Sequence, residues 1–420
     1  MNLNTILIIS AVIICLAFEE ASAIPVWARK YGASCTTCHV SIPKLNSFGE
    51  AFRFNGYRFP KETKDILEEA PVPLGGKPQE KQWPGNAIWP GEIPASPPLS
   101  IRTELDFNFS FNNEDEIVFD LPHEIYVLSG GNLGESISFF LELLLIKDGS
   151  FGGLRRSFLQ FDSPIWDNKL LNVIIGQFEI SAIPSSQIRR ITSLSDNIIN
   201  SFQNGLNTIT LNTPRSGAEL WGIKDGREGG GLFYSVGIVE APSDSISSGG
   251  YAHKSSGKDI YARLSYKFGG LALSGESGPV PQGGSWRDNH LRLGGFYYSG
   301  NSSVSDYTRR GLDLRIQVQD LDLLLGMAFG KDDLYLSPAS TMSFTAYFIE
   351  ANYLFFPWMI GAVRFDAGFT PDDPLIDDIN NLLLNLSFSI RPNVVVRTEL
   401  LKELATQGST VSRMRFDFAF

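Results

Sequence analysis

The chain has 420 residues, enough for two or three ordinary domains or for one large barrel. It carries 46 acidic and 35 basic residues, and its net charge is −11. This balance excludes nucleic acid as a partner, because binding phosphate requires a basic surface. Hydrophobic residues make up 43% of the chain. Even so, no run after residue 23 reaches the roughly 18 uninterrupted apolar residues of a membrane-spanning helix.

Residues 1–23 predict a secretory signal peptide. An apolar run, Ile6–Phe18, precedes the small residues Ala21, Ser22 and Ala23, which form a cleavage site. The segment before Ile6 has no lysine or arginine, so a retained membrane anchor stays open as the alternative. We expect export and cleavage, after which the chain keeps two cysteines.

These two cysteines, Cys35 and Cys38, are followed directly by His39. Three chemistries use such a pair in an exported protein: a disulfide, a thioredoxin-like redox centre, and covalent haem attachment. A redox centre needs a strand before the motif and a supporting α/β domain, which the flanking residues do not indicate. In Cys-x-x-Cys-His, two thioethers hold haem c and the histidine is the proximal iron ligand. The motif therefore predicts one covalent haem c.

A short helix is expected after the motif, with Ser41 as its N-cap, Pro43 in its first turn and Gly56 as its stop. The apolar stripe that would cover a porphyrin face consists of Leu45, Phe48 and Phe52. Residues 24–70 number only 47, too few to form much of a core without a cofactor. We therefore interpret 24–70 as a monohaem cytochrome c segment whose core is the haem.

Residues 71–98 form a separate region, because they contain eight prolines in 28 residues. This density predicts an extended, semi-rigid linker without regular elements.

Residues 99–420 alternate apolar and polar side chains. The run LSIRTELDFNFSF, at 99–111, is the clearest example, and similar runs recur at 312–318, 363–369 and 413–420. Runs of 10 to 13 residues have the length of a tilted strand that crosses a bilayer. Short turns alternate with longer polar loops, and the chain ends on an aromatic residue. The pattern predicts an all-β outer-membrane barrel of antiparallel strands, with its apolar face toward lipid and its charged face toward the lumen.

The strand count is uncertain by one or two. Seventeen stretches are typical of strands, whereas single-chain bacterial barrels have an even number. Omitting 270–276 leaves 16 strands, and adding 203–212 instead gives 18; we expect 16. With the C-terminus in the periplasm, the loops around 331–340, 370–377 and 405–410 face outside. Acidic residues in such loops, including Asp332 and Asp333, either concentrate a divalent cation or are simply solvated.

The run 25–57 resembles the fused monohaem cytochrome c–porins of bacterial outer membranes, whose best-known members take electrons from extracellular Fe(II). The matching positions are Ala28, Arg29, Cys35, Cys38, His39, Pro43, Leu45, Asn46, Phe48, Gly49, Phe52, Gly56 and Tyr57. The likeness covers about 33 residues and is only architectural over the barrel. It implies an electron conduit between extracellular Fe(II), or another redox partner, and a periplasmic carrier such as a soluble cytochrome.

Membrane thickness supports a haem segment lodged in the lumen. The hydrocarbon core is about 30 Å thick, so a haem in the periplasm does not reach an extracellular donor. A barrel of roughly 16 strands has a wide interior. The charged residues expected to line it, and to pair with the segment or simply be solvated, are Arg102, Glu104, Asp313, Arg315, Arg364, Asp366, Arg397, Glu399, Arg413 and Arg415.

Two questions stay open at the level of sequence. No distal haem ligand is identified, since the remaining histidines are His123, His253 and His290 and no methionine lies between His39 and the barrel. The alternative function is a diffusion porin in which the haem segment is a gate or sensor. A haem enzyme such as a peroxidase is a weaker alternative, because no distal acid–base group is evident.

Overall fold

The structure is a computed structural model. It describes residues 26–420 except 63–65, 76–80, 83–91, 96, 112–115, 164–168, 184–189, 203–206, 208, 242–256, 277–286, 303–304, 336–339, 372–377 and 405–407. The predicted signal peptide and His253 therefore lie outside the described residues.

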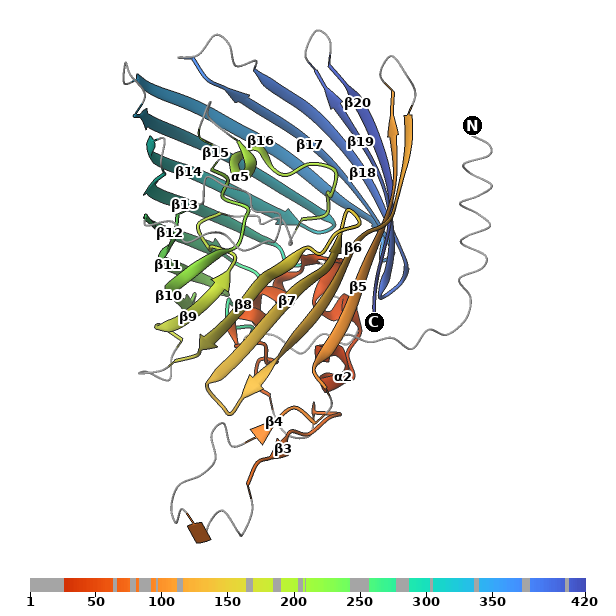
Figure 1. The fold of residues 1–420 in the computed structure, drawn as a ribbon. Helices are drawn as coiled ribbons and strands as arrows, with labels where there is room; N and C mark the ends of the chain where they lie inside the picture. Colours follow the sequence, from red (N-terminus) through yellow and green to blue (C-terminus); the bar gives the residue numbers. More distant parts are fainter. Residues whose placement is uncertain are drawn as a thin grey trace.

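Sixteen antiparallel strands form one closed barrel (Figure 1). In chain order they are β5 Leu99–Ser110, β6 Glu116–Leu133, β7 Ile137–Lys147, β8 Gly153–Phe161, β9 Asn172–Phe178, β10 Arg215–Asp225, β11 Gly230–Glu240, β12 Lys258–Phe268, β13 His290–Asn301, β14 Ser305–Val318, β15 Leu321–Leu334, β16 Ser340–Phe356, β17 Met359–Phe369, β18 Ile379–Arg391, β19 Val394–Glu403 and β20 Thr410–Ala419. The last strand, β20, pairs with the first, β5, and closes the ring. The preferred count of 16 is confirmed, and neither 270–276 nor the described part of 203–212 adds a barrel strand.

The barrel is apolar outside and polar inside. Along β5, Leu99 and Ile101 are exposed whereas Ser100 and Glu104 are buried, as the alternation predicts. Outward-facing apolar residues of other strands include Ile175, Leu220, Val236, Ile260, Leu264, Leu293, Leu312, Met327, Ile349, Val363 and Leu384. A closed barrel with this surface is a transmembrane barrel, because lipid replaces water at its outer face. Among the described residues, no helix is long and apolar enough to span a membrane.

The two ends of the barrel differ. Two-residue connections at 319–320, 357–358 and 392–393 lie at the end that carries both Leu99 and the C-terminus. Aromatic rings gather near this end: Trp358 stacks on Phe356 at 5.1 Å between ring centroids. Such a belt is typical of a membrane interface. The connections β15–β16, β17–β18 and β19–β20 lie at the opposite end, as expected of outer loops.

One expectation about these outer loops is wrong. Asp332 and Asp333 belong to strand β15, because the β14–β15 ladder continues to Leu334. Asp332 is fully buried and pairs with Arg309 at 2.6 Å, so it contributes nothing to an exposed acidic rim. Asp333 is exposed and pairs with Lys331.

The N-terminal segment lies inside the barrel, near the end that carries the C-terminus (Figure 1). It comprises α2 Val26–Tyr31, a 3₁₀ turn at Cys35–Thr37, β1 His39–Ser41, β2 Lys44–Leu45 and α3 Ser47–Phe54. The amide of Val26 donates to Ser100 Oγ at 2.9 Å. Lys44 Nζ lies 3.0 Å from Asp322 Oδ2, and both groups are buried. These contacts fix the segment to strands on opposite parts of the barrel.

The helix after the motif begins later than predicted. Ser41 does not cap it, because Ser41 pairs with Lys44 in the small β1–β2 hairpin. Asn46 is the N-cap and accepts a hydrogen bond from Gly49 N at 2.9 Å. The predicted stop is confirmed: Gly56 has φ +63°, and Tyr57 N donates to Phe52 O at 2.9 Å.

The proline-rich linker is not free of regular structure, contrary to the prediction. β3 Val72–Pro73 pairs with β4 Glu92–Ile93, and the pair lies outside the barrel (Figure 1). An isolated two-stranded ladder tolerates Pro73, because each strand has an edge at which no N–H is required.

A second segment enters the lumen from the connection between β9 and β10. It carries the short helix α5, Ile198–Ser201, which contacts β15, β16 and β17. Ile198, Ile199 and Phe202 are buried, and Phe202 lies 4.5 Å from the ring of Phe344. The lumen therefore holds two inserted segments, one near each half of the barrel (Figure 1).

Candidate functional site

A cavity of about 230 Å³ separates the N-terminal segment from the barrel wall. Cys35, Cys38 and His39 all line it. Its apolar lining includes Val26, Trp27, Ile42, Leu45, Phe52, Tyr57, Phe59, Leu128 and Phe140. Three arginines, Arg53, Arg102 and Arg156, line it as well. The structure thus brings Leu45 and Phe52 to the motif, whereas Phe48 is 3% exposed and packs behind them against Phe59.

The motif is held by a tight turn. Ser34 Oγ accepts from Thr36 N, and Cys38 N donates to Cys35 O at 3.2 Å. Both thiols are free and partly buried. The approach of α3 to this turn requires Gly49: a Cβ there would lie 2.3 Å from Cys38 O. The main chain of the motif therefore packs directly on the helix.

Backbone contacts in the following hairpin orient His39. Its Nδ1 lies 3.2 Å from the carbonyl oxygen of Pro43. Because a carbonyl only accepts, Nδ1 carries the proton and Nε2 has the free lone pair. Burial lowers the pKa of His39 to about 4, so the ring is neutral near pH 7. A neutral imidazole with one free nitrogen is the form that binds a metal.

Burial also shifts the two thiols. It raises the pKa of Cys38 to about 12 and raises the pKa of Cys35 as well. A redox-active pair depends on a lowered thiol pKa, so that a thiolate is present near pH 7. This environment argues against the thioredoxin-like alternative for the motif.

An aromatic cluster forms one side of the cavity. Trp27 stacks on Tyr57 at 4.9 Å and on Phe140 at 5.8 Å between ring centroids, and meets Phe52 edge-on at 5.7 Å. The buried indole Nε1 of Trp27 has no hydrogen-bond partner among the described residues. An unpaired donor beside a largely apolar cavity is an available contact for an acceptor group of a ligand.

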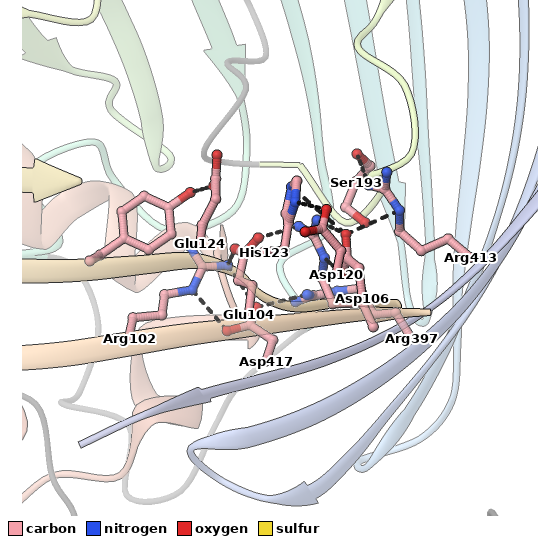
Figure 2. Close-up of polar contacts among 12 residues, drawn as sticks. Arg102, Glu104, Asp106, Asp120, His123, Glu124, Ser193, Arg397, Arg413 and Asp417 are labelled. Atoms are coloured by element: carbon pink, nitrogen blue, oxygen red, sulfur yellow. Dashed lines mark hydrogen bonds and ion pairs between the residues drawn. The ribbon is translucent and has the colours of Figure 1, made fainter. Parts of the chain in front are cut away.

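A second, polar cavity of about 390 Å³ lies next to the first, and Pro43 and Arg102 line both. Figure 2 shows the polar network beside it. Arg102 forms two bonds to Asp417, at 2.8 and 2.6 Å. Arg415 forms two to Asp106, both at 2.6 Å. The two-point geometry fixes each guanidinium against the barrel wall.

All ten lumen charges predicted from the sequence do face inward. They pair mainly with one another and with the inserted β9–β10 segment. For example, Arg364 donates to Thr192 Oγ1 at 2.8 Å, and Glu399 accepts from Ser193 N at 2.8 Å. The groups that hold the N-terminal segment were not predicted: Asp322, Glu350, Asp288 and Lys267. For Asp322, Glu350 and Lys267, the lumen-facing strand position was the signal that could have identified them; Asp288 precedes β13 and had no such signal.

The remaining histidines do not meet His39. His123 lines the polar cavity, and His290 is buried beside Asp288 at the start of β13. Of the described residues that line the first cavity, none is a second histidine or a methionine. The structure therefore identifies no distal iron ligand.

Known structures with the same fold are outer-membrane porins. An anion-selective porin from Comamonas acidovorans aligns at TM-score 0.53 and 12% identity, over 77% of this chain and 99% of that chain. OmpF of Salmonella typhi aligns at 0.52 and 7% identity, over 77% and 97%. The channel DcaP of Acinetobacter baumannii aligns at 0.50 and 11%, over 77% and 96%. No family of sequences and no curated protein matches the chain. The chain therefore has the fold of an outer-membrane porin, and at these identities the likeness concerns the fold alone.

Proposed function

We propose that this chain is an electron conduit of a Gram-negative outer membrane, exported by its signal peptide and carrying one covalent haem c. Cys35 and Cys38 hold the haem by thioethers, and His39 is the proximal ligand. One observation carries the proposal: the complete Cys-x-x-Cys-His motif lines a cavity inside the lumen of a closed transmembrane barrel.

The residues around the cavity fit this cofactor. Phe52, Leu45 and Trp27 offer apolar faces to a porphyrin, while Arg53 and Arg156 offer cations to its propionates. His39 already has its Nδ1 hydrogen-bonded and its Nε2 free. When bound, haem c supplies one-electron redox chemistry. The chain contributes the fixed imidazole, the apolar enclosure and the position within the membrane.

The position of the segment suggests the two partners. It lies near the end of the barrel at which the first strand, β5, begins and the last strand, β20, ends. This end faces the periplasm in an outer-membrane barrel. A periplasmic carrier such as a soluble cytochrome takes or supplies electrons there. On the outer side the partner is extracellular Fe(II) or another redox couple, and the outer face of the barrel contacts lipid.

A diffusion porin with a haem gate or sensor is the second candidate, and the barrel fold favours it. The conduit accounts better for the contents of the lumen. The N-terminal segment is held there by the buried ion pair Lys44–Asp322, and the segment 190–202 by buried hydrogen bonds such as that from Arg364 to Thr192 Oγ1. A channel for solutes gains nothing from such filling.

A spectrum tests the proposal directly. The purified chain, folded in detergent, should show the reduced-minus-oxidised difference spectrum of haem c. It should also stain for haem after denaturing electrophoresis. In addition, its haem should be reduced by Fe(II). A chain that lacks covalent haem when it is produced with haem-attachment machinery would contradict the proposal.

A further inference from the structure

A β-bulge in β6 gathers carboxylates around His123. Glu104 pairs with Glu124 across the β5–β6 ladder, and Asp106 pairs with Asp120, so residues 121–123 together oppose one residue of β5. The strict alternation of a strand would place residue 123 on the other face from residues 120 and 124. The bulge instead brings His123 beside Asp120 and Glu124, as Figure 2 shows.

Two carboxylates face the same nitrogen of His123. Nδ1 lies 2.8 Å from Asp120 Oδ2 and 3.0 Å from Asp148 Oδ1. One ring nitrogen carries at most one proton, so it cannot donate a full hydrogen bond to both oxygens. The three ligand atoms lie within 4.8 Å of one another. In the described part of the chain, no lysine or arginine forms an ion pair with Asp120 or Asp148.

A second set of ligand atoms shares the same histidine. Glu104 and Glu124 lie within 4.8 Å of His123 on the lumen side. Glu104 is 2% exposed and its Oε2 accepts no hydrogen bond, although the Arg415 guanidinium lies against it. Arg102 lies 2.6 Å from Oε1 of the same residue. These two cations already balance Glu104 and would repel a metal ion placed there. The acidic pair at Nδ1 has no such counter-ions and is the better site.

The set lies about half-way along the β5–β6 ladder, because Glu124 pairs with Glu104 and Lys147 while the ladder continues outward to Ser110 and Glu116. Asp148 lies in the β7–β8 connection, at the end of the barrel opposite the termini, and 57% of its side chain is exposed. His123 lines the polar cavity, which meets the cavity of His39 at Pro43 and Arg102. The set therefore lies beside the polar cavity that adjoins the Cys-x-x-Cys-His motif.

We propose that Asp120, His123 and Asp148 bind a divalent first-row transition-metal cation beside the polar cavity of the lumen. One imidazole and two carboxylates suit such an ion, and water fills its other positions. The role of the site rests on the function proposed above: the bound ion is the substrate Fe(II). A haem held by Cys35, Cys38 and His39 would supply the one-electron acceptor for this ion, so that Fe(II) would become Fe(III) with no covalent bond made or broken.

Mn(II) tests the site without reducing the haem. The free ion gives a strong electron paramagnetic resonance signal that weakens on binding, so titration of the intact chain measures affinity. The wild-type chain should bind one Mn(II), and His123→Ala and Asp148→Asn should each weaken binding by on the order of tenfold or more. Asp333→Asn is the matched control, since Asp333 is an exposed acidic residue outside the site. Equal affinity in the wild-type and both variant chains overturns the proposal, and so does the absence of binding by the wild type.

A second readout separates this inference from the function on which it rests. With Fe(II) as reductant, both variants should reduce haem more slowly than wild type, whereas a neutral reductant should act equally on all. If Mn(II) binds as expected but the chain has no covalent haem, the conduit fails and the metal site stands. If haem is present and reducible but the variants bind Mn(II) with wild-type affinity, the metal site is wrong and the conduit stands. Asp148 is largely solvent-exposed, so its variant keeps the test valid should His123→Ala fold poorly.

Discussion

His39 and the two cysteines have separable roles at the residue scale. In the proposed conduit the thiols would form the covalent bonds to haem, whereas the imidazole, oriented by Pro43 O, would only ligate iron. No barrel strand includes any of these residues. Changes to them should therefore alter the proposed cofactor without disturbing the strand ladders.

Cys35→Ala or Cys38→Ala should impair or abolish covalent haem while the barrel still inserts, and the double variant should lose haem completely. His39→Ala should keep the covalent bond but shift the Soret band, because the iron loses its proximal nitrogen. Haem staining after denaturation and the absorbance spectrum measure the two effects. A double cysteine variant that still stains would show that attachment lies elsewhere. Heat-modifiable mobility on gels is the control for barrel folding.

Asp162 makes the docking of the N-terminal segment dependent on pH. It lies just beyond β8, where Gln160 Nε2 donates to Asp162 Oδ1 at 2.7 Å and to Arg53 O at 3.3 Å. Burial raises the pKa of Asp162 from 3.8 to about 6. The docked state therefore binds a proton more tightly than the undocked state does.

The direction of the pH effect on docking follows from this difference in the pKa of Asp162. The contribution of Asp162 to docking is fully present below pH 4, where Asp162 is protonated in both states, and is lost as pH rises to about 6, by up to about 3 kcal/mol. This contribution should lower the urea midpoint of the wild-type chain, relative to that of Asp162→Asn, as pH rises over this range. The Asp162→Asn variant has no titrating group at this position. An identical pH profile in wild type and variant would show that Asp162 is not responsible.

At the element scale, Arg364 joins the inserted β9–β10 segment to the barrel. This residue of β17 is fully buried. It donates to Thr192 Oγ1 at 2.8 Å and to Ser195 Oγ at 2.6 Å, and pairs with Asp366 at 2.7 Å. One side chain thus holds a segment of loop across the lumen.

Arg364→Ala should release that segment. Removing one member of a buried pair costs roughly 3–5 kcal/mol, because its carboxylate partner is left uncompensated. The barrel ladders should survive, so the expected result is a higher single-channel conductance in planar bilayers with unchanged heat-modifiability. Lys331→Ala is the control, since Lys331 forms only an exposed pair with Asp333. Equal conductance in both variants would mean that the segment does not obstruct the lumen.

The elements that could be predicted from sequence are those whose pattern is imposed by their surroundings. Lipid outside and polar groups inside force a period of two in the sequence. Strands such as β5, and the total of 16 strands, could therefore be predicted. The Cys-x-x-Cys-His motif could be recognised from the sequence because its five residues are contiguous in the chain. The start of α3 was wrong because Ser41 and Asn46 are both good caps, and only the β1–β2 pairing decides between them.

Long-range pairing explains what else the sequence did not reveal. Arg102 meets Asp417 across 315 positions of the chain, through the closure of β20 on β5. The inward direction of a lumen charge follows from alternation, but its partner depends on the register of distant strands. The bulge that places His123 beside Asp120 depends on register in the same way. The sequence therefore predicted which residues face the lumen and not which of them meet.

At the scale of the whole molecule, the barrel and its contents are separable. Every barrel strand pairs with two barrel neighbours, and none pairs with the N-terminal segment. The segment is held instead by side chains such as Lys44, whose partners Asp322 and Glu350 would be hydrated in a water-filled lumen. Removing the segment should therefore open the barrel and leave it folded.

Joining residue 23 directly to residue 99 tests the conduit against the open porin. The full-length chain should show little conductance in planar bilayers, because two inserted segments occupy its lumen. The shortened chain should show larger, stable conductance steps, since only the β9–β10 segment then remains inside. Adding Arg364→Ala to the shortened chain should raise conductance further. Large steps from the full-length chain, equal to those of the shortened one, would instead favour a solute channel, because a lumen that passes ions freely is not filled by the segment that carries His39.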